Sequence, residues 1–502
     1  MKTHAPQCKI TLVKAQKRTE IVPGLPIAQD RYQGLDAIDL TPFLLTEGAS
    51  LNIAKSVREP AGAFSISIPD QPRSAGKTGF VETVYALVEP MDYIEIRLAH
   101  NPEDYAGKKK LGIVMRGFVS QVSRSESMQG GRPARSVTIS GQDMGKIWQI
   151  MQIYYINNMV LGEYNLSPLK YYHRWATENE AKHLPASEYL QNTLNDIINP
   201  FLKELATLET PPENMESIST WTLKCSLIGE ISPYTIASFQ DVSVYGMMAK
   251  LLDVGPFNEL YTQDEEEGVY LVARPIPYKN LKDGQYIQPG ANAEILAISS
   301  ADIESLSVSR SDASVANSYW VSSEQWDIPN NVSQKELANQ YGEAGDFLLN
   351  EYLNTHQKYY GWRKMEVSAL LGPPDYLASD GNKQSGQNEQ VTALGNFLAE
   401  KRHLLAEMNK DAVVFEQGQI SMKGNEKLKA GTFLKITRGM GKIEIMECYA
   451  HTIAHEFTPL TGLFRTVAQF DRGTGWVVRA KSKTPLYRTE VDMGGALGKA
   501  SK

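Results

Sequence analysis

The sequence predicts a mainly β fold with α+β insertions, built around two small β-barrels. Short runs of alternating apolar and polar residues lie between glycine- and proline-rich turns, as at Ile94, Ile96 and Leu98. A period of two is typical of strands that bury one face. These runs gather in two blocks, separated by a stretch with helical spacing. A chain of 502 residues is also too long for one compact core, so more than one domain is expected.

We expect the chain to divide into successive segments. They are an N-terminal arm (1–30), a first barrel (31–146), a helical insertion with a small α/β domain (147–302), a second barrel (303–475) with a helical excursion at about 333–410, and a C-terminal tail (476–502). In the first block, Val84, Ala86 and Val88 alternate and predict a further strand. Turns are expected near 69–79, 101–108 and 129–133.

The central stretch combines helices with one hairpin. Pro200 lies inside a helical apolar pattern and predicts a kink or break near Asn199, because proline lacks the N–H that continues a helix. The apolar positions of this pattern are Leu190, Leu194, Ile197, Ile198, Phe201 and Leu205. Ser243 is expected to cap a shorter helix that ends at Gly255 and Pro256. Its apolar face holds Val244, Met247, Met248 and Leu251. A hairpin with an acidic turn from Asp264 to Gly268 follows.

The second block begins with a strand near 303–321 and is then interrupted. A capping box at Ser333 and Glu336 predicts the start of a helix. Residues 362–371 favour a returning strand, 372–390 a polar loop, and 391–409 a helix. The final strands alternate at Ile420 and Met422, at Phe433 or Leu434, and at Ile443 and Ile445. Turns are expected at Gly424-Asn425 and at 439–441.

The end of this block carries a recognisable pattern of residues. It consists of Tyr449, Ile453, His455, Phe457, Pro459, Gly462, Thr466, Arg472 and Gly473. Four weaker matches precede it along the chain. The first is segment 47–68, in which Gly62, Phe64, Ile66 and Ile68 are expected to point inward. The others are segment 90–97, Gly117-Phe118-Val119 together with segment 137–148, and segment 307–321. Together they resemble baseplate hub proteins of contractile-tailed phages, a family that includes late control protein D and VgrG-like hubs. The stretch from about 150 to 235 matches nothing in that family.

The resemblance implies two tail-tube-like barrels per chain and a purely structural role. Three chains would form a ring that adapts a sixfold tail tube to a threefold central spike. Its implied partners are two further copies, the spike below, a tube or tube-initiator protein above, wedge proteins of the baseplate and a tape-measure protein in the lumen. Viral DNA would pass only in transit, during host cell entry and genome ejection. The implied location is the virion tail baseplate, assembled in the host cytoplasm and without membrane insertion.

Composition excludes several other classes. A net charge of −7 argues against a dedicated nucleic-acid binder. No apolar run reaches the roughly 18 residues of a membrane span, and the N-terminus has no apolar core of a secretory signal. The three cysteines, Cys8, Cys225 and Cys448, are far apart and indicate neither a disulfide framework nor a zinc knuckle.

Basic segments have two interpretations. Lys108-Lys109-Lys110 and the tail, with Arg479, Lys481, Lys483 and Arg488, suit a solvated turn and a flexible end. Alternatively they contact an acidic partner or passing DNA. We expect the tail and the 372–390 loop to become ordered only against partners, because both are poor in apolar residues.

His451 and His455 are the nearest approach to a metal site. On a helix they would share a face, but the order of histidine and glutamate in zinc peptidase motifs is absent. The flanking residues favour a strand, in which the two Cα atoms lie about 13 Å apart. We therefore expect both histidines to be structural.

Other candidate motifs are incomplete. Ser74 to Thr78 ends like a phosphate-binding loop, but position 71 is glutamine and a strand is expected after it. The glycines near Lys499 lie in the tail, and the acidic run Asp264 to Glu267 is expected to be a solvated turn. The aromatic residues at 154–155 and 171–175 suit packing better than base stacking.

The sequence therefore predicts no catalytic residue, no metal ligand and no cofactor, and the protein is not expected to be an enzyme. The main hypothesis is a phage baseplate hub. The alternative with the same fold is the hub of a type VI secretion or pyocin-like injection machine. From another class, a β-rich cell-wall hydrolase or a carbohydrate-binding protein stays open; the former would need a converging acid pair or metal triad that no segment supplies.

Overall fold

The computed structural model describes the chain in blocks with gaps between them. The described residues are 5–14, 19–20, 29–30, 37–70, 72–75, 80–108, 110–129, 132–153, 160–161, 164–165, 184–205, 220–231, 242–322, 353–372, 384–438 and 444–474. Within them the fold is mainly β with shorter helical insertions, as the sequence predicts.

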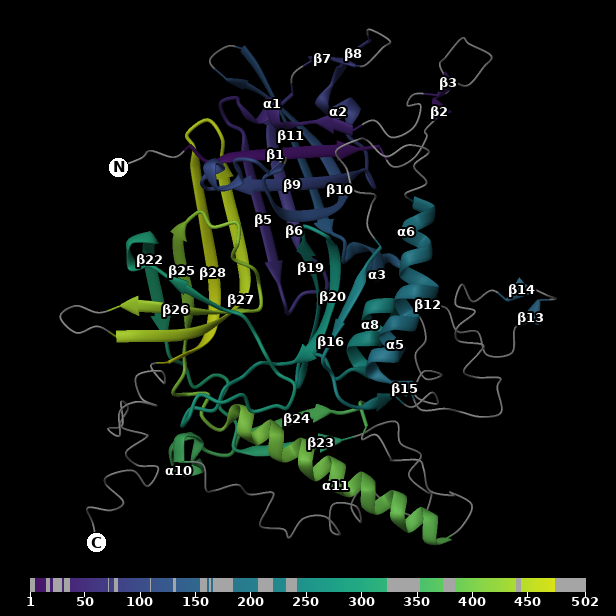
Figure 1. The fold of residues 1–502 in the computed structure, drawn as a ribbon, viewed down its shortest axis with the longest axis vertical. Coiled ribbons are helices and arrows are strands. Elements are labelled where there is room, and N and C mark those ends of the chain that lie inside the picture. Colours follow the sequence, from purple (N-terminus) through teal and green to yellow (C-terminus); the bar gives the residue numbers. More distant parts are fainter. Residues whose placement is uncertain are drawn as a thin grey trace.

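Among the described residues, thirteen strands form one bent sheet, which consists of two groups (Figure 1). The first group, here called the first barrel, is ordered β5 (Ser50–Ser56), β6 (Ala63–Pro69), β11 (Arg132–Asp143), β10 (Gly112–Gln129), β9 (Tyr93–Ala99), β1 (Gln7–Val13) and β4 (Ala37–Asp39). The second barrel is ordered β22 (Ile303–Ser309), β25 (Glu416–Lys423), β28 (Leu463–Thr474), β27 (Glu444–Thr458), β26 (Thr432–Arg438) and β21 (Ile295–Ile298).

Each group rolls up because its two edge strands follow one another in the chain. In the first barrel, β4 leads into β5 through the short helix α1 (Thr41–Leu44). In the second, β21 leads into β22 through the 3-10 turn η4 (Ser300–Asp302). Connections this short bring the two edges of each sheet to the same place. Each barrel also has its own apolar core, which follows from the alternation along its strands.

Most strands predicted from alternation occur, one of them with a change of face. Phe64, Ile66 and Ile68 are buried in the first barrel, and Ile420 and Met422 in the second. Ile445 was expected to point inward, but it is only half-buried, and its neighbour Met446 lies in the core. The inward face of β27 is therefore offset by one residue from the predicted one. Its other face carries Glu447 and Tyr449, which contact Lys279 and Glu259.

The two barrels share one strand order. Read from the edge, β5-β6-β11-β10-β9-β1 of the first barrel corresponds to β22-β25-β28-β27-β26-β21 of the second. A β-bulge gives the alignment: the β10–β11 register shifts between Val119 and Gln121, and the β27–β28 register shifts between Glu447 and Tyr449 and again between Ala450 and Thr452. The second shift of β27 is the match, because the Val119 carbonyl accepts from the Met91 N–H as the Ala450 carbonyl accepts from the Gly431 N–H. The barrels differ at the last strand, since β1 is antiparallel to β9 whereas β21 is parallel to β26.

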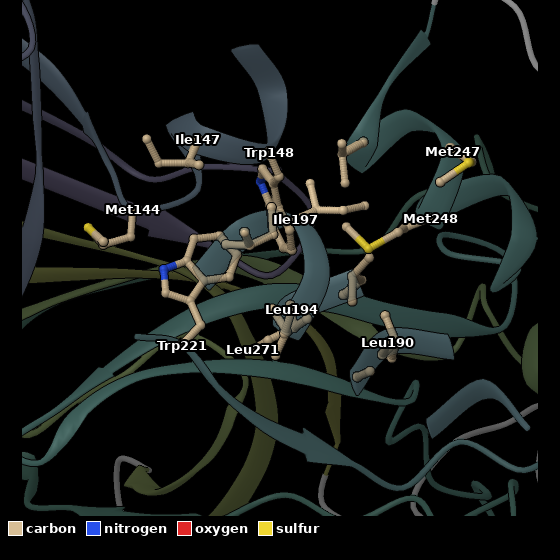
Figure 2. Close-up of a cluster of buried hydrophobic side chains, with 14 of the residues drawn as sticks. Met144, Ile147, Trp148, Leu190, Leu194, Ile197, Trp221, Met247, Met248 and Leu271 are labelled. Atoms are coloured by element: carbon tan, nitrogen blue, oxygen red, sulfur yellow. The ribbon is translucent and has the colours of Figure 1, made fainter. Parts of the chain in front are cut away.

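A small α/β layer packs beside the barrels. Its sheet contains β16 (Thr222–Cys225), β20 (Gly268–Pro275) and β19 (Asn258–Glu265), in which β19 and β20 form the predicted hairpin. Four helices cover it: α3 (Lys146–Ile150), α5 (Ala186–Thr193), α6 (Asn199–Leu205) and α8 (Val244–Leu251). Figure 2 shows their shared core around Trp148 and Trp221, whose rings meet edge to face at 5.2 Å. The Trp148 Nε1–H donates to the Pro60 carbonyl at 2.7 Å and ties this layer to the first barrel.

The predicted break before Pro200 is a change of helix type. α5 continues into η3 (Leu194–Ile198), a π-helical turn, and α6 begins at Asn199, the residue before Pro200. A π turn accommodates the hydrogen bond that proline cannot make. Ser243 caps α8 as expected, its side chain accepting from the Gly246 N–H at 3.0 Å. The helix ends at Leu251, earlier than the Gly255-Pro256 pair.

A third layer lies below the barrels in Figure 1. Strand β23 (Ser318–Ser322) pairs in parallel with β24 (Lys364–Ser368), and the long helix α11 (Gln384–Asn409) packs on them. The short helices η6 (Leu353–Thr355) and α10 (Gln357–Tyr360) lie nearby. Two expectations are corrected here. The strand near 303–321 is two strands in different sheets, β22 and β23, and residues 384–390 belong to α11, not to a polar loop.

The first block needs a further correction. Residues 84–88, expected to be a strand, form helix α2 (Val84–Leu87), because the Thr83 side chain caps it by accepting from the Ala86 N–H at 3.3 Å. The turn regions contain η2 (Pro102–Tyr105) and the hairpin β7 (Pro72–Ala75) with β8 (Phe80–Thr83). The remaining short pairs are β2 (Thr19–Glu20) with β3 (Gln29–Asp30), β12 (Gln152–Ile153) with β18 (Val242–Ser243), β13 (Val160–Leu161) with β14 (Tyr164–Asn165), and β15 (Leu184–Pro185) with β17 (Glu230–Ile231).

Several predicted features lie outside the described residues. They are the capping box at Ser333, most of the 372–390 loop, the aromatic residues at 154–155 and 171–175, and the tail after Thr474. The segment boundaries stay a prediction; β1, from the predicted arm, pairs within the first barrel. None of the described helices is long and apolar enough to cross a membrane.

Candidate functional site

The two barrels are joined where strand β27 changes partner. Its residues 444–450 pair with β26, and residues 452–457 pair with β5 of the first barrel, while β28 accompanies it on the other side. The switch falls at His451, whose carbonyl accepts from the Val57 N–H at 3.0 Å. A continuous ladder therefore runs from one barrel into the other, and we treat this junction as the candidate functional site.

The β19–β20 hairpin lies across the junction, and residues at and near its tip form ion pairs with both barrels. Asp264 is 5% exposed and forms an ion pair with Lys55 of β5. Lys55 also reaches Asp143 of β11 at 3.2 Å, and the Thr262 hydroxyl donates to the same carboxylate at 3.1 Å. Burial alone lowers the pKa of Lys55, but the negative charges of Asp264 and Asp143 outweigh it and raise that pKa overall. Lys55 therefore stays charged between two acids.

The next residues of the tip are held by arginines of the first barrel. Arg97 donates to Glu266 Oε2 at 2.8 Å, and the Ile113 N–H donates to Oε1 at 2.9 Å. Arg116 donates to the Glu265 carbonyl at 2.6 Å and to the Glu266 carbonyl at 3.3 Å. Although partial burial raises the pKa of Glu266, these donors lower it overall. The acidic run is predicted to be a solvated turn, and its turn residues Glu266 and Glu267 are exposed. The prediction fails at Asp264, which is buried, and Glu266 also accepts from two donors.

The second barrel contacts both ends of the same hairpin. At the tip, Lys429 pairs with Glu265 at 2.5 Å. At the base, Arg274 of β20 donates to Glu259 of β19 at 3.1 Å and to the Gly431 carbonyl at 2.8 Å. The Tyr449 hydroxyl of β27 donates to Glu259 at 2.5 Å. Burial, followed by the nearby Glu259 charge, raises the pKa of Tyr449 well above its usual value, so it stays a neutral donor.

The junction encloses little space. A cavity of about 40 Å³ lies between Lys55, Asp143, Asp264 and His455. A single water needs roughly 10–15 Å³ measured in this way, so the cavity has room for a few waters and not for a substrate. In the described part of the chain, no group of three or more His, Cys, Asp or Glu side chains has a metal-binding arrangement. The contacts that the junction does contain are the ion pairs that join the hairpin to both barrels.

Both candidate histidines lie on strand β27, as predicted. His455 is 4% exposed, and its Nδ1 lies 3.0 Å from the Thr466 hydroxyl. Burial lowers the pKa of His455 to about 4. His451 is half-buried, with its Nδ1 2.9 Å from the Thr452 hydroxyl. That neither residue binds a metal stays a prediction.

The other candidates lie apart from the junction. Ser74 and Ala75 belong to β7, while Gly76 to Thr78 are outside the described residues. The element expected after this motif to be a strand is partly the helix α2. Lys108 lies over the Tyr105 ring at 5.5 Å. The three thiols are free, and burial raises the pKa of Cys8 to about 12, which leaves it unreactive.

Sequence reasoning missed Lys55, Arg97, Arg116 and the partners that they bring together. Their signal was weak: charged residues inside strands whose other positions are apolar. Arg97 stands between Ile96 and Leu98, so its side chain points out of the barrel. Asp143 was noticed within a strand pattern, but without a role. The partners lie far apart in sequence, so no local motif could connect them.

Comparisons with known proteins place this geometry in context. No protein-family model matches the sequence, and no curated protein does. The 43 kDa tail protein of prophage MuSo2 from Shewanella oneidensis is similar in structure, with a TM-score of 0.43 and 10% identity over 92% of this chain and 98% of that one. A tail protein from Neisseria meningitidis has a TM-score of 0.41 and 9% identity, over 93% and 97% of the two chains. The E. coli c3393 protein is described as a type VI secretion component with structural similarity to the T4 tail proteins gp27 and gp5; its TM-score is 0.36, with 8% identity over 84% and 72%.

Proposed function

We propose that this protein is the structural hub of a contractile phage tail baseplate. Three copies would form a ring that adapts a sixfold tail tube to a threefold central spike. The observation that carries the proposal is the presence of two barrels with one strand order in a single chain. Three such chains present six barrels around an axis, which allows threefold and sixfold partners to share it.

The junction supports this role because an adaptor must keep its barrels in a fixed relative position. The β5–β27 ladder alone could bend, as a two-strand contact does. The β19–β20 hairpin adds ion pairs to both barrels, from Lys55 and Arg97 on one side and Lys429 on the other. The Lys55–Asp264 pair is largely buried, and removing one partner of a buried ion pair costs roughly 3–5 kcal/mol. The pairs of Glu266 and Glu265 are partly exposed and contribute less each, so the set together favours one orientation.

The residues that carry the sequence resemblance support the same conclusion. Phe457, Thr466 and His455 are buried at the junction or in the core, and Gly62 lies against Lys55 and Asp143 with no room for a Cβ. They shape the barrels and the junction between them. The proposed role is accordingly structural and not enzymatic, with partner contacts made by surfaces.

The proposed partners are the spike below, a tube or tube-initiator protein above, wedge proteins at the side and a tape-measure protein in the lumen. The same architecture serves the hub of a type VI or pyocin-like machine, and the neighbouring genes discriminate between them: tape-measure and capsid genes accompany a phage tail. A cell-wall hydrolase or carbohydrate-binding protein would instead be a monomer with affinity for glycan.

Light scattering tests the proposal on the isolated protein and on its complex with the spike encoded beside it. We expect three copies of this chain in the complex, eluting as one species. A stable dimer or hexamer in the complex would contradict the hub assignment, as would a monomer that binds glycan and not the spike.

A further inference from the structure

One stretch of each barrel can be compared directly at the junction. In the second barrel, β27 pairs with β26 through Ala450 and then with β5 at residues 452–457. In the first barrel, β10 pairs with β9 through Phe118, and Val119 exchanges hydrogen bonds with Met91 and Asp92. Beyond that point, in the described part of the chain, β10 has strand β11 on one side and no strand on the other.

The shared bulge shows which residues correspond. Gln121 follows the bulge in β10, and Thr452 follows it in β27. Residues 121–126 of β10 therefore correspond to residues 452–457 of β27, the stretch that β5 covers. In β10 this stretch is exposed on both faces, apart from the partly buried Val122.

The strand corresponding to β5 is β22, the edge of the second barrel. In the first barrel, Gln121 pairs with Ser140, Ser140 with Ser65, and Ser65 with Asn52 of β5. In the second barrel, Thr452 pairs with Gln469, Gln469 with Gln419, and Gln419 with Ser307 of β22. Asn52 thus corresponds to Ser307. Among the described residues, β22 pairs only with β25, so its outer edge is free.

Burial differs between these two corresponding edges. In β5, which pairs with β27, Leu51 and Ile53 are 0% and 2% exposed. Their counterparts in β22 are Leu306, which is only partly buried, and Val308, which is 39% exposed. A long free edge with an exposed β-branched residue is a template for pairing with another chain.

We propose that β22 of one copy pairs antiparallel with residues 121–126 of β10 in the next copy, and thereby repeats the β5–β27 junction between chains. The donor and acceptor edges lie on different surfaces of the same chain, so the contact is head-to-tail and generates a ring when it closes. That the ring holds three copies rests on the proposed function; the pairing itself rests on the correspondence of the barrels.

The correspondence also assigns the register. In the junction within the chain, Asn52 lies opposite Glu456, which places Ser307 opposite Ser125 of the next copy. Ser309 then lies opposite Ser123, and Val308 opposite Arg124. Serines on facing positions are small and can hydrogen-bond across the pair, so one face of this ladder contains no bulky or like-charged neighbours.

Cysteine cross-linking tests the register in the full chain. Cross-strand neighbours have Cα atoms about 4.5–5.5 Å apart, within the range of a disulfide. The variant with Ser125→Cys and Ser307→Cys is therefore expected to form covalent multimers on mild oxidation, visible on a non-reducing gel and lost on reduction. The matched control combines Ser127→Cys with Ser309→Cys. In the assigned register these residues are four positions apart, roughly 13 Å along the strand, and should not cross-link.

The two single-cysteine variants and the parent chain, with its three native cysteines, complete the set. Cross-linking of the control pair as fast as the assigned pair would overturn the proposal, as would a disulfide confined to single chains. Trimers in light scattering without this cross-link would retain the hub and reject the interface. Cross-linked rings of another size would retain the interface and reject a trimeric hub.

An edge substitution gives a second measurement. Val308→Lys places a charge on the proposed contact while leaving the barrel core intact, and charged edge residues oppose strand pairing. It is expected to weaken self-association at least tenfold in sedimentation. Ile228→Lys, at an exposed isoleucine in the α/β layer, is the control and should associate like the parent. Equal behaviour of the two variants would contradict the proposal.

Discussion

The two barrels follow one plan with exchanged residues. In the first barrel, Tyr93 of β9 packs edge to face on Phe118 of β10, with ring centroids 5.8 Å apart. At the corresponding position of the second, Phe433 of β26 packs on Tyr449 of β27 at 5.3 Å. The aromatic pair is kept, but tyrosine and phenylalanine have changed strands.

A second pair shows the same exchange. Phe64 of β6 lies opposite Gly141 of β11, and a Cβ on Gly141 would meet the Phe64 ring at 2.4 Å. In the second barrel, glycine is on the other strand: Gly418 of β25 lies opposite Phe470 of β28. An aromatic ring beside a glycine fills the same volume from either strand. Packing therefore requires one aromatic residue and one glycine in each facing pair, but it does not fix which strand carries which. The two barrels can for this reason share a fold without a visible sequence repeat.

The edges differ more than the cores. The first barrel closes its seam with α1, whose Leu44 is fully buried, and gives its edge strand β5 to the junction. The second barrel has only the turn η4 at its seam, and the outer edge of β22 is free among the described residues. The comparison indicates that the cores preserve the fold, whereas the edges are specialised for contacts, one within the chain and one that we assign to the next copy.

The junction should be far more sensitive to substitution than the surface of either barrel. Asp264→Ala removes one of the two acids that pair with Lys55 and the carboxylate that lies 3.9 Å from Arg116, at a largely buried position. We expect the free energy of unfolding to fall by roughly 3–5 kcal/mol, measured by urea denaturation. Asp302→Ala removes an exposed partner of Lys423 in the second barrel and should cost about 0–1 kcal/mol. Similar losses in both variants would show that the hairpin is not the clamp between the barrels.

Histidine protonation should distinguish the second barrel from the first, which has Arg124 at the position corresponding to His455. The pKa of buried His455 is lowered from 6.5 to about 4. The unfolded chain therefore binds a proton that the folded chain rejects, so stability falls as the pH drops from about 6.5 to 4 and is constant above that range. The full loss from this group is about 3 kcal/mol.

The measurement is the free energy of unfolding at pH 7 and pH 4 in the parent and in His455→Gln. The glutamine variant should lose less stability on acidification by about that amount. His451→Gln is the comparison: burial and Arg58 lower the pKa of this ring as well, but the ring is only half-buried, so the substitution should change the pH dependence less. If His455→Gln loses as much stability between pH 7 and pH 4 as the parent, the acid sensitivity does not come from His455 and the prediction is wrong.

Local sequence patterns predict those strands and helices that bury one face and expose the other. The strand from Tyr93, the β19–β20 hairpin and the Ser243-capped helix follow from alternation or from a single cap. The failures have equally local causes. Thr83 caps a short helix where Val84 and Val88 alternate, and a strand pattern near Tyr319 pairs in a separate sheet. Alternation predicts a strand, but it does not tell which sheet receives it.

The junction was beyond prediction for a different reason. Asp264 was noticed only as part of an acidic run, and its position in a turn suggested solvent. Its burial depends on Lys55, 209 residues earlier, and on arginines of other strands. Ion pairs across such separations follow from the packing of whole layers, so the sequence indicates the charges but not their partners.

The smallest expected effect concerns the two tyrosines of the exchanged aromatic pairs, Tyr93 in the first barrel and Tyr449 in the second. The Tyr449 hydroxyl donates to Glu259 Oε1 at 2.5 Å and accepts from Arg274 at 3.1 Å. Tyr449→Phe therefore removes the donor of one oxygen of this buried carboxylate, while Arg274 still donates to the other. We expect it to lower the free energy of unfolding by roughly 1.5–3 kcal/mol. For the Tyr93 hydroxyl, no hydrogen bond is found among the described residues, and Tyr93→Phe should change stability by less than about 0.5 kcal/mol. If the two substitutions cost the same, the tyrosine of the second barrel has no special role at the junction, and the exchange between the barrels reflects packing alone.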